Sequence, residues 1–214
     1  GTIGFYGSNL NTRQFATKCF LEKLIAQVFT GRERFEPGNP QEGYSPSPQE
    51  RQSWLQISYM KEAYHTMGPK FTLGWMAAAL YSSKNFSENY TATMMQAGEF
   101  APTPHSKLMY NEAFRANQYV AAGIKPIYVL NAMFQFRTEF YGFTPIFPIK
   151  KNALNKAYYG KAFSRFEYMG EVSVICHLPF GAISAYVNHY SSPRREWNVG
   201  MTIGWQLFNY RFVE

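Results

Sequence analysis

Ionisable side chains that could carry acid–base chemistry are few and scattered along this chain. The histidines are His65, His105, His177 and His189, and none has a partner at metal-ligand spacing. All 14 acidic residues are Glu, so mechanisms that need an Asp are excluded. Glu167 and Glu171 lie four residues apart, which on an extended strand places both carboxylates on one face. They could form an acid pair, but a polar, water-facing surface is the simpler interpretation.

No sequence motif indicates nucleophilic catalysis or metal binding. The chain has no Gly-x-Ser-x-Gly nucleophile elbow and no glycine-rich phosphate loop. The two cysteines, Cys19 and Cys176, are too few for a metal site or a disulfide framework, and their spacing does not tell whether they pair. Residues 89–91 match a glycosylation sequon, a short motif with little weight. We therefore expect no catalytic residues, cofactor or metal in this chain.

Two charged residues stand out by their surroundings. Arg137 and Glu139 alternate with Phe136 and Phe140, so a strand would place the charges on one face and the rings on the other. Charges at bilayer depth are costly unless they are paired or in contact with water. The first interpretation is a water-facing lumen. The second is a partner from elsewhere in the fold, for which Arg115 is the candidate.

Composition favours strands and a membrane environment. Aromatic residues make up 18% of the 214 residues, which suits strands and also the interfaces of a bilayer. No run of 18 or more apolar residues is present, which excludes a transmembrane helix. The net charge is +7, but the basic residues are scattered rather than grouped, so nucleic-acid binding is not expected.

Alternating hydrophobicity is clearest in residues 197–207. One face of that strand would be apolar, made of Trp197, Val199, Met201, Ile203, Trp205 and Leu207. The other face would be small or polar. The segment is long enough for a tilted strand to cross a bilayer.

The same alternation predicts further antiparallel strands. They cover residues 54–65, 71–81, 119–128, 133–141, 162–177 and 181–190. Tight turns near 66–70, 129–132 and 177–181 alternate with long loops at 31–51, 82–117 and 146–160, a pattern typical of outer-membrane barrels. Residues 15–29 fit an amphipathic helix ending at Gly31 as well as a strand, and periodicity leaves both open.

Several short motifs resemble the barrel of patatin-like phospholipases from Bacteroidetes. They are residues 86–91 (FSENYT), 100–104 (FAPTP), 114–117 (FRAN) with 121–123 (AAG), 166–171 (FEYMGE), 178–181 (LPFG) and 204–208 (GWQLF). The resemblance runs over most of the chain, and the motifs are specific in combination rather than singly.

The resemblance implies an all-β transmembrane barrel of the bacterial surface-antigen type. In that family a sixteen-stranded barrel follows a patatin lipase domain, so residues 1–214 would form a single barrel segment of about eight to nine strands, the C-terminal half. Residues 2–10 would be the eighth strand, 11–18 a turn and Cys19 onward the ninth strand, which favours a strand over a helix for 15–29. The implied partners are the lipid bilayer, the remaining strands and the upstream lipase domain, in the outer membrane of a Gram-negative bacterium.

The resemblance also implies a structural ion pair. In that superfamily the sixth outer loop folds into the lumen, and an Arg near its tip pairs with an acid on the thirteenth strand. Phe114-Arg115-Ala116 matches the loop motif, although Ala116 stands where Gly is usual, and Glu139 falls on the thirteenth strand. We therefore expect Arg115 and Glu139 to pair.

Two functions follow as expectations. The first is a membrane anchor or translocation pore for a patatin-like lipase whose catalytic Ser and Asp lie outside this chain. The alternative is a soluble β-barrel that binds an apolar ligand, because alternation does not tell which face is the interior.

Overall fold

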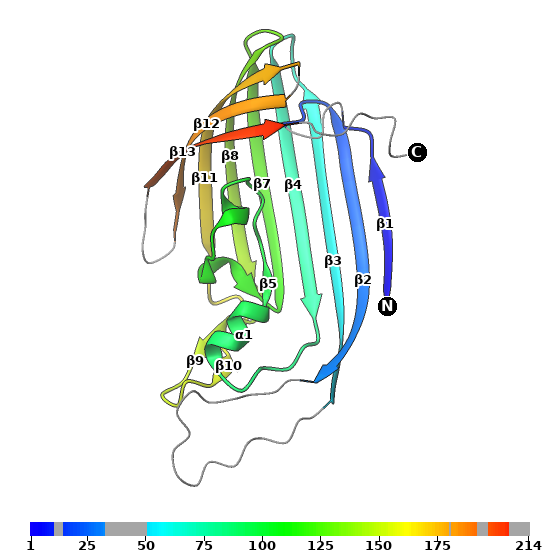
Figure 1. Ribbon diagram of the computed structural model, residues 1–214, viewed down its shortest axis with the longest axis vertical. Helices are drawn as coiled ribbons and strands as arrows, with labels where there is room; N and C mark the ends of the chain where they lie inside the picture. The colour runs from blue at the N-terminus through cyan, green and yellow to red at the C-terminus, as the bar shows by residue number, and fades with distance from the viewer. Residues whose placement is uncertain (11–14, 33–50, 180, 192–196, 206–214) are drawn as a thin grey trace.

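The computed structural model describes residues 1–10, 15–32, 51–179, 181–191 and 197–205 (Figure 1). The prediction of an antiparallel all-β fold is confirmed: the described residues contain one nine-stranded sheet in which each strand pairs with its neighbours in sequence order. Its strands are β1 (Thr2–Ser8), β2 (Cys19–Arg32), β3 (Arg51–Thr66), β4 (Phe71–Ser82), β7 (Gln118–Val129), β8 (Phe134–Pro145), β11 (Glu167–Leu178), β12 (Gly181–Tyr190) and β13 (Trp197–Trp205). Residues 206 and 207 of the last predicted strand lie outside the described residues.

Tight connections gather at one end of the sheet and long ones at the other (Figure 1). The turns from β3 to β4, β7 to β8 and β11 to β12 fall where the sequence predicts them. In the β7–β8 turn, the Asn131 side chain accepts hydrogen bonds from the backbone N–H groups of Met133 and Phe134, each at 2.8 Å. These local bonds stabilise the turn.

Residues 15–29 do not form a helix, because from Cys19 onward they belong to β2, which pairs along its whole length with β3 and over residues 21–27 with β1. Phe20, Leu24 and Val28 are all exposed on one face. A spacing of four residues fits both the helical period and an even number of strand residues, which explains why periodicity left both structures open. The predicted strand at 162–177 begins later, at Glu167.

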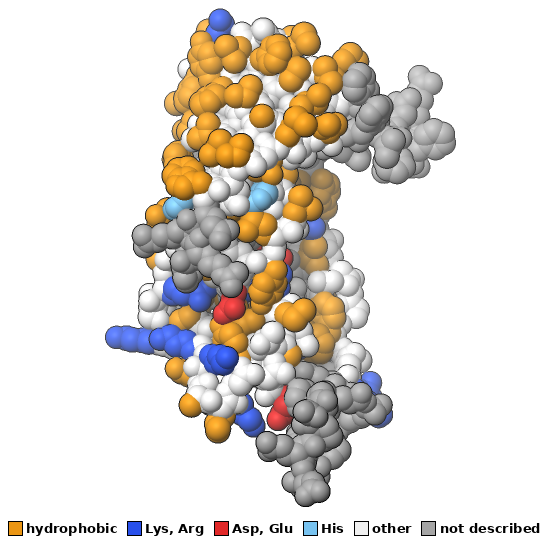
Figure 2. Space-filling view, turned by 60° about the vertical axis from the view of Figure 1, so that its left-hand side comes forward, with side chains coloured by type: hydrophobic (Ala, Val, Ile, Leu, Met, Phe, Trp, Pro, Cys, Tyr) orange, Lys and Arg blue, Asp and Glu red, His pale blue; other side chains and the backbone are white. Residues whose placement is uncertain are grey.

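The two faces of the sheet differ sharply in chemistry. Large apolar side chains on the outward face are exposed, and one side of the molecule shows them covering the half nearer the tight turns (Figure 2). The opposite face buries polar and charged groups, among them Thr72, Lys125, Gln135, Arg137, Glu139, Glu171, Ser173, Ser184 and Asn188. The sheet curls but is not closed within the described residues, where β1 and β13 are its two edges.

The long connections carry small elements of their own. They are α1 (Tyr90–Gln96), β5 (Gly98–Glu99), the 3-10 turns Ser106–Leu108 and Glu112–Phe114, β6 (Arg115–Ala116), β9 (Ile149–Lys151) and β10 (Ala157–Tyr159). Residues 83–117 lie against the inner face of the sheet, where Phe100 and Phe114 pack in one buried cluster with Tyr119, Tyr141 and Phe143. This loop therefore fills part of the space that the sheet encloses.

Candidate functional site

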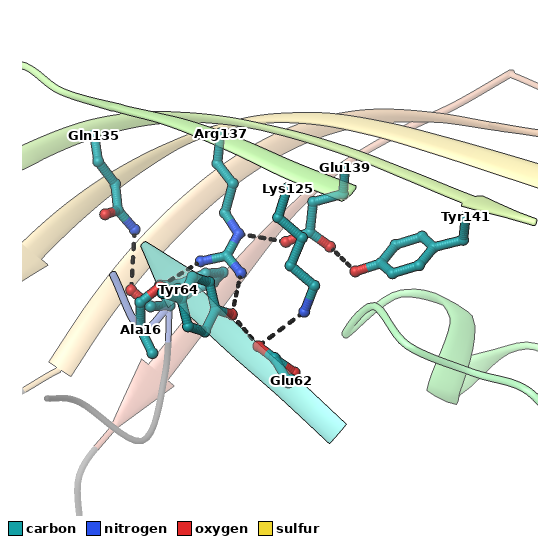
Figure 3. A network of polar contacts seen from close by, with 9 residues as sticks. Ala16, Glu62, Tyr64, Lys125, Gln135, Arg137, Glu139 and Tyr141 are labelled. Atoms are coloured by element: carbon teal, nitrogen blue, oxygen red, sulfur yellow. Dashed lines mark hydrogen bonds and ion pairs between the residues drawn. The ribbon is translucent and has the colours of Figure 1, made fainter. Parts of the chain in front are cut away.

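Arg137 is the centre of a polar network on the inner face of the sheet (Figure 3). Its side chain is buried, and its guanidinium donates to Glu139, to the Ala16 carbonyl oxygen at 3.1 Å and to the Tyr64 hydroxyl at 2.8 Å. Glu139 also accepts a hydrogen bond from the Tyr141 hydroxyl. A buried charge with this many partners is stabilised where an unpaired one would be very costly.

A second ion pair extends the network across the strands. Lys125 of β7 pairs with Glu62 of β3 at 2.9 Å, and the Tyr64 hydroxyl donates to the same carboxylate (Figure 3). The strand between them, β4, contributes Gly74, where a Cβ atom would lie 2.7 Å from the Tyr64 ring and 3.1 Å from the Lys125 Cβ. Glycine at position 74 thus makes room for Tyr64 to lie across β4.

The predicted pairing of Arg115 with Glu139 is not among the ion pairs of the described residues, which give both residues other partners. Arg115 pairs with Glu99 at 2.7 Å and donates to the carbonyl oxygens of Met95 and Ala97. Glu99 lies directly opposite Arg115 in the β5–β6 ladder, and Arg137 lies two residues from Glu139 on the same strand face. Each charge is therefore neutralised by a nearer group.

The other candidate residues take up separate structural roles. Glu171 accepts from Asn188 at 3.4 Å, whereas Glu167 accepts from Ser191 at 2.5 Å and pairs with Arg165, so the two do not form an acid pair. His105 hydrogen-bonds the Tyr190 hydroxyl at 2.9 Å, and His65 accepts from the Trp75 indole at 3.2 Å.

Metal-ligand clusters and a disulfide are not found in the described part of the chain. No group of three or more His, Cys or acidic side chains there could hold a metal ion. Cys19 and Cys176 are both described, and both are unpaired.

A cavity of about 820 Å³ lies along the inner face, bordered by the network. Charged groups of both signs reach it, namely Lys23, Glu62, Glu99, Lys107, Lys125, Arg137, Glu139 and Glu171. Thr202 and Gly204 of β13 also line it, opposite Leu21 and Lys23 of β2. Residues from both sides of the sheet therefore border one space, whose lining mixes charged and apolar side chains.

Comparison with protein-family models, curated proteins and solved structures gives no match for this chain. Within the described residues, no helix has the length and apolarity needed to cross a membrane.

Proposed function

We propose that the chain forms part of the wall of an outer-membrane β-barrel and serves as a membrane anchor. One observation carries the proposal. Along β8, Phe136 and Phe140 are 41% and 53% exposed, while the alternating Arg137 and Glu139 are 3% and 6% exposed. A strand with apolar side chains outward and charges inward matches a barrel wall in lipid around a wet lumen.

Aromatic rows on the outward face support the same proposal. Near the tight turns, Phe71, Tyr128 and Phe136 lie side by side across β4, β7 and β8. Toward the long loops, the His189 ring is 6.2 Å from Tyr168 and 4.8 Å from Trp197, across β11, β12 and β13. The exposed valines Val172, Val187 and Val199 lie side by side across β11, β12 and β13, between the levels of these two rows. Aromatic girdles on both sides of an aliphatic band are typical of membrane barrels.

The soluble alternative fits the side-chain distribution less well. A soluble barrel that holds an apolar ligand needs an apolar interior and a polar exterior. Here the inner face buries the Arg137 network and the outer face exposes Phe, Val and Ile. We therefore do not favour apolar-ligand binding.

The loop at residues 83–117 favours an anchor over an open pore. Phe100 and Phe114, 3% and 1% exposed, pack on the inner wall and occupy space that a cargo would need. We further propose that additional strands complete the barrel beyond β1 and β13, because open sheet edges are not satisfied in lipid. A patatin-like lipase domain is the partner that the sequence resemblance implies.

The test is a gel of the outer-membrane fraction of the native source, boiled and unboiled, probed with an antibody to this segment. We expect a membrane-bound band that shifts on boiling, as a barrel resistant to detergent would. A band in the soluble fraction that does not shift would overturn the proposal. A mass far above 24.7 kDa would direct the search for the lipase to the same polypeptide.

A further inference from the structure

The loop at residues 146–166 concentrates positive charge at the long-loop end of the sheet. It holds five basic residues and no acidic one, in a chain with 14 Glu. The five are Lys150, Lys151, Lys156, Lys161 and Arg165. On the side of the molecule drawn in Figure 2, most of the Lys and Arg side chains lie in the half away from the tight turns.

Three of these lysines have no acidic partner in the described part of the chain. Lys150, Lys151 and Lys161 are exposed, and none of them takes part in an ion pair within the described residues. Lys156 has a loose contact of 3.8 Å with Glu88, and Arg165 pairs with Glu167. The exposed lysines are therefore available to an external anion.

The loop holds these charges on an ordered scaffold. The β9–β10 hairpin closes through Asn152, whose side chain accepts from the backbone N–H groups of Leu154 and Lys156 at 3.0 and 2.8 Å. Ile149, 3% exposed, packs with Met94 and Ala97 of the α1 region. The positions of the lysine backbones are thus set before any ligand binds.

Exposed apolar side chains accompany the lysines on the same loop. Leu154 at the hairpin tip is 79% exposed, and Phe163 and Phe166 are 61% and 64% exposed. The Phe166 ring covers Gly142 on the outward face of β8, so the loop returns to the sheet beside the aromatic row of Tyr168. Lysines mixed with aromatic and aliphatic groups fit a lipid headgroup layer better than a free anion in water.

We propose that loop 146–166 binds the phosphate groups of lipids in the leaflet around the long-loop end, through Lys150, Lys151 and Lys161. The inference rests on the proposed membrane location and adds the class of ligand. Lysine supplies compact positive charge to phosphate, and the aromatic and leucine side chains supply contact with the acyl boundary.

The experiment compares lipid binding by the full chain folded in uncharged detergent, with native mass spectrometry as the readout. The probes are phosphatidic acid, phosphatidylcholine with the same acyl chains, and inorganic phosphate as competitor. The test variant is Lys151→Gln with Lys161→Gln, which spares Lys150 because its stem covers Gly160. The charge-matched control is Lys18→Gln with Lys70→Gln, near the tight turns.

We expect the wild type to prefer phosphatidic acid and the test variant to bind it about 25-fold more weakly, since each lysine at an anionic surface contributes roughly a fivefold factor. The control should keep the wild-type preference, and excess inorganic phosphate should not displace the lipid. Equal binding of both lipids, an equal loss in the control, or displacement by inorganic phosphate would each overturn the inference. The gel of the native outer-membrane fraction tests the membrane proposal separately: a heat-modifiable band there without lipid preference here sinks the inference alone, and no such band sinks both.

Discussion

Arg137 holds a full charge inside the sheet because three groups compensate it. The Glu139 carboxylate neutralises the charge, while the Ala16 carbonyl oxygen and the Tyr64 hydroxyl accept hydrogen bonds from its other N–H groups. Replacing Arg137 by Ala would leave Glu139 buried without this partner. We expect Arg137→Ala to lower the free energy of unfolding by about 3–5 kcal/mol, measured by urea titration of the chain folded in detergent.

The matched control is Lys156→Ala, which removes an exposed ion pair in the long connections. Lys156 lies 3.8 Å from Glu88, and both side chains are substantially solvent-accessible. Solvent screens such a pair, so the loss should be far smaller than for Arg137. Equal decreases in the free energy of unfolding of the two variants would show that burial of the Arg137 network does not add to stability.

Neighbouring residues on β13 test which face meets lipid. Ile203 is 60% exposed on the outward face, whereas Thr202 lines the inner cavity. Ile203→Arg should destabilise the chain in bilayers by about 2–4 kcal/mol if position 203 lies at the midplane. Thr202→Arg should destabilise the chain much less, because in the proposed barrel Thr202 faces a water-filled lumen. The folding yield of each variant in lipid vesicles measures both effects. A larger loss for Thr202→Arg than for Ile203→Arg would mean that Thr202, and not Ile203, lies on the lipid-facing side.

Sequence could predict which charges share one face of a strand, but not which groups they contact. Arg137 and Glu139 follow from strand alternation alone. The contact between Arg115 and Glu99 was missed because it depends on the ladder of β5 and β6, where Glu99 lies opposite Arg115. A ladder of two residues leaves no recognisable pattern in the sequence. Tyr64 was missed as well, because its contact depends on Gly74 lying beneath its ring.

At the scale of elements, the loop at residues 83–117 depends on contacts with the strands that it covers. His105 hydrogen-bonds Tyr190 of β12, and burial lowers the pKa of His105 below its usual 6.5. The folded chain therefore resists protonation of this ring, so its stabilising contribution is present above pH 6.5 and is lost as the pH falls through the lowered pKa.

We expect the urea midpoint of the wild type to fall as the pH drops below about 6.5, because the unfolded chain binds the proton more readily. His105→Gln should remove that part of the pH dependence while other titrating groups remain. Identical pH profiles of the two proteins would rule out His105 as the source.

Strands were predictable where alternation is long, as in β4, β7 and β12. The helix α1 was not, although Asn89 caps it by accepting from the Ala92 N–H at 2.8 Å. Asparagine before a short apolar run is a usable start signal, and here it competed with the sequon interpretation of residues 89–91. The start of β11 shifted to Glu167 because Phe163 has a left-handed backbone, with φ of 51°, that a strand cannot accommodate.

For the molecule as a whole, the open edges of the sheet predict which backbone amides exchange fastest with solvent. In the isolated chain folded in detergent, amides on the free edge of β1 have no strand partner, whereas β7 is paired on both sides. Hydrogen exchange should therefore be fastest in β1 among the strands β1, β4, β7 and β8. Equal protection in β1 and β7 would mean that the edge of β1 is already paired, by β13 or by a second chain.

Strict neighbour-to-neighbour pairing has a consequence for how the chain acquires its structure. Every ladder in the main sheet joins strands that follow one another along the sequence, so no strand must wait for a distant segment. The entropy of closing each hairpin grows only slowly with the length of its loop. The sheet can consequently grow by adding one hairpin at a time, with each completed pair serving as the template for the next.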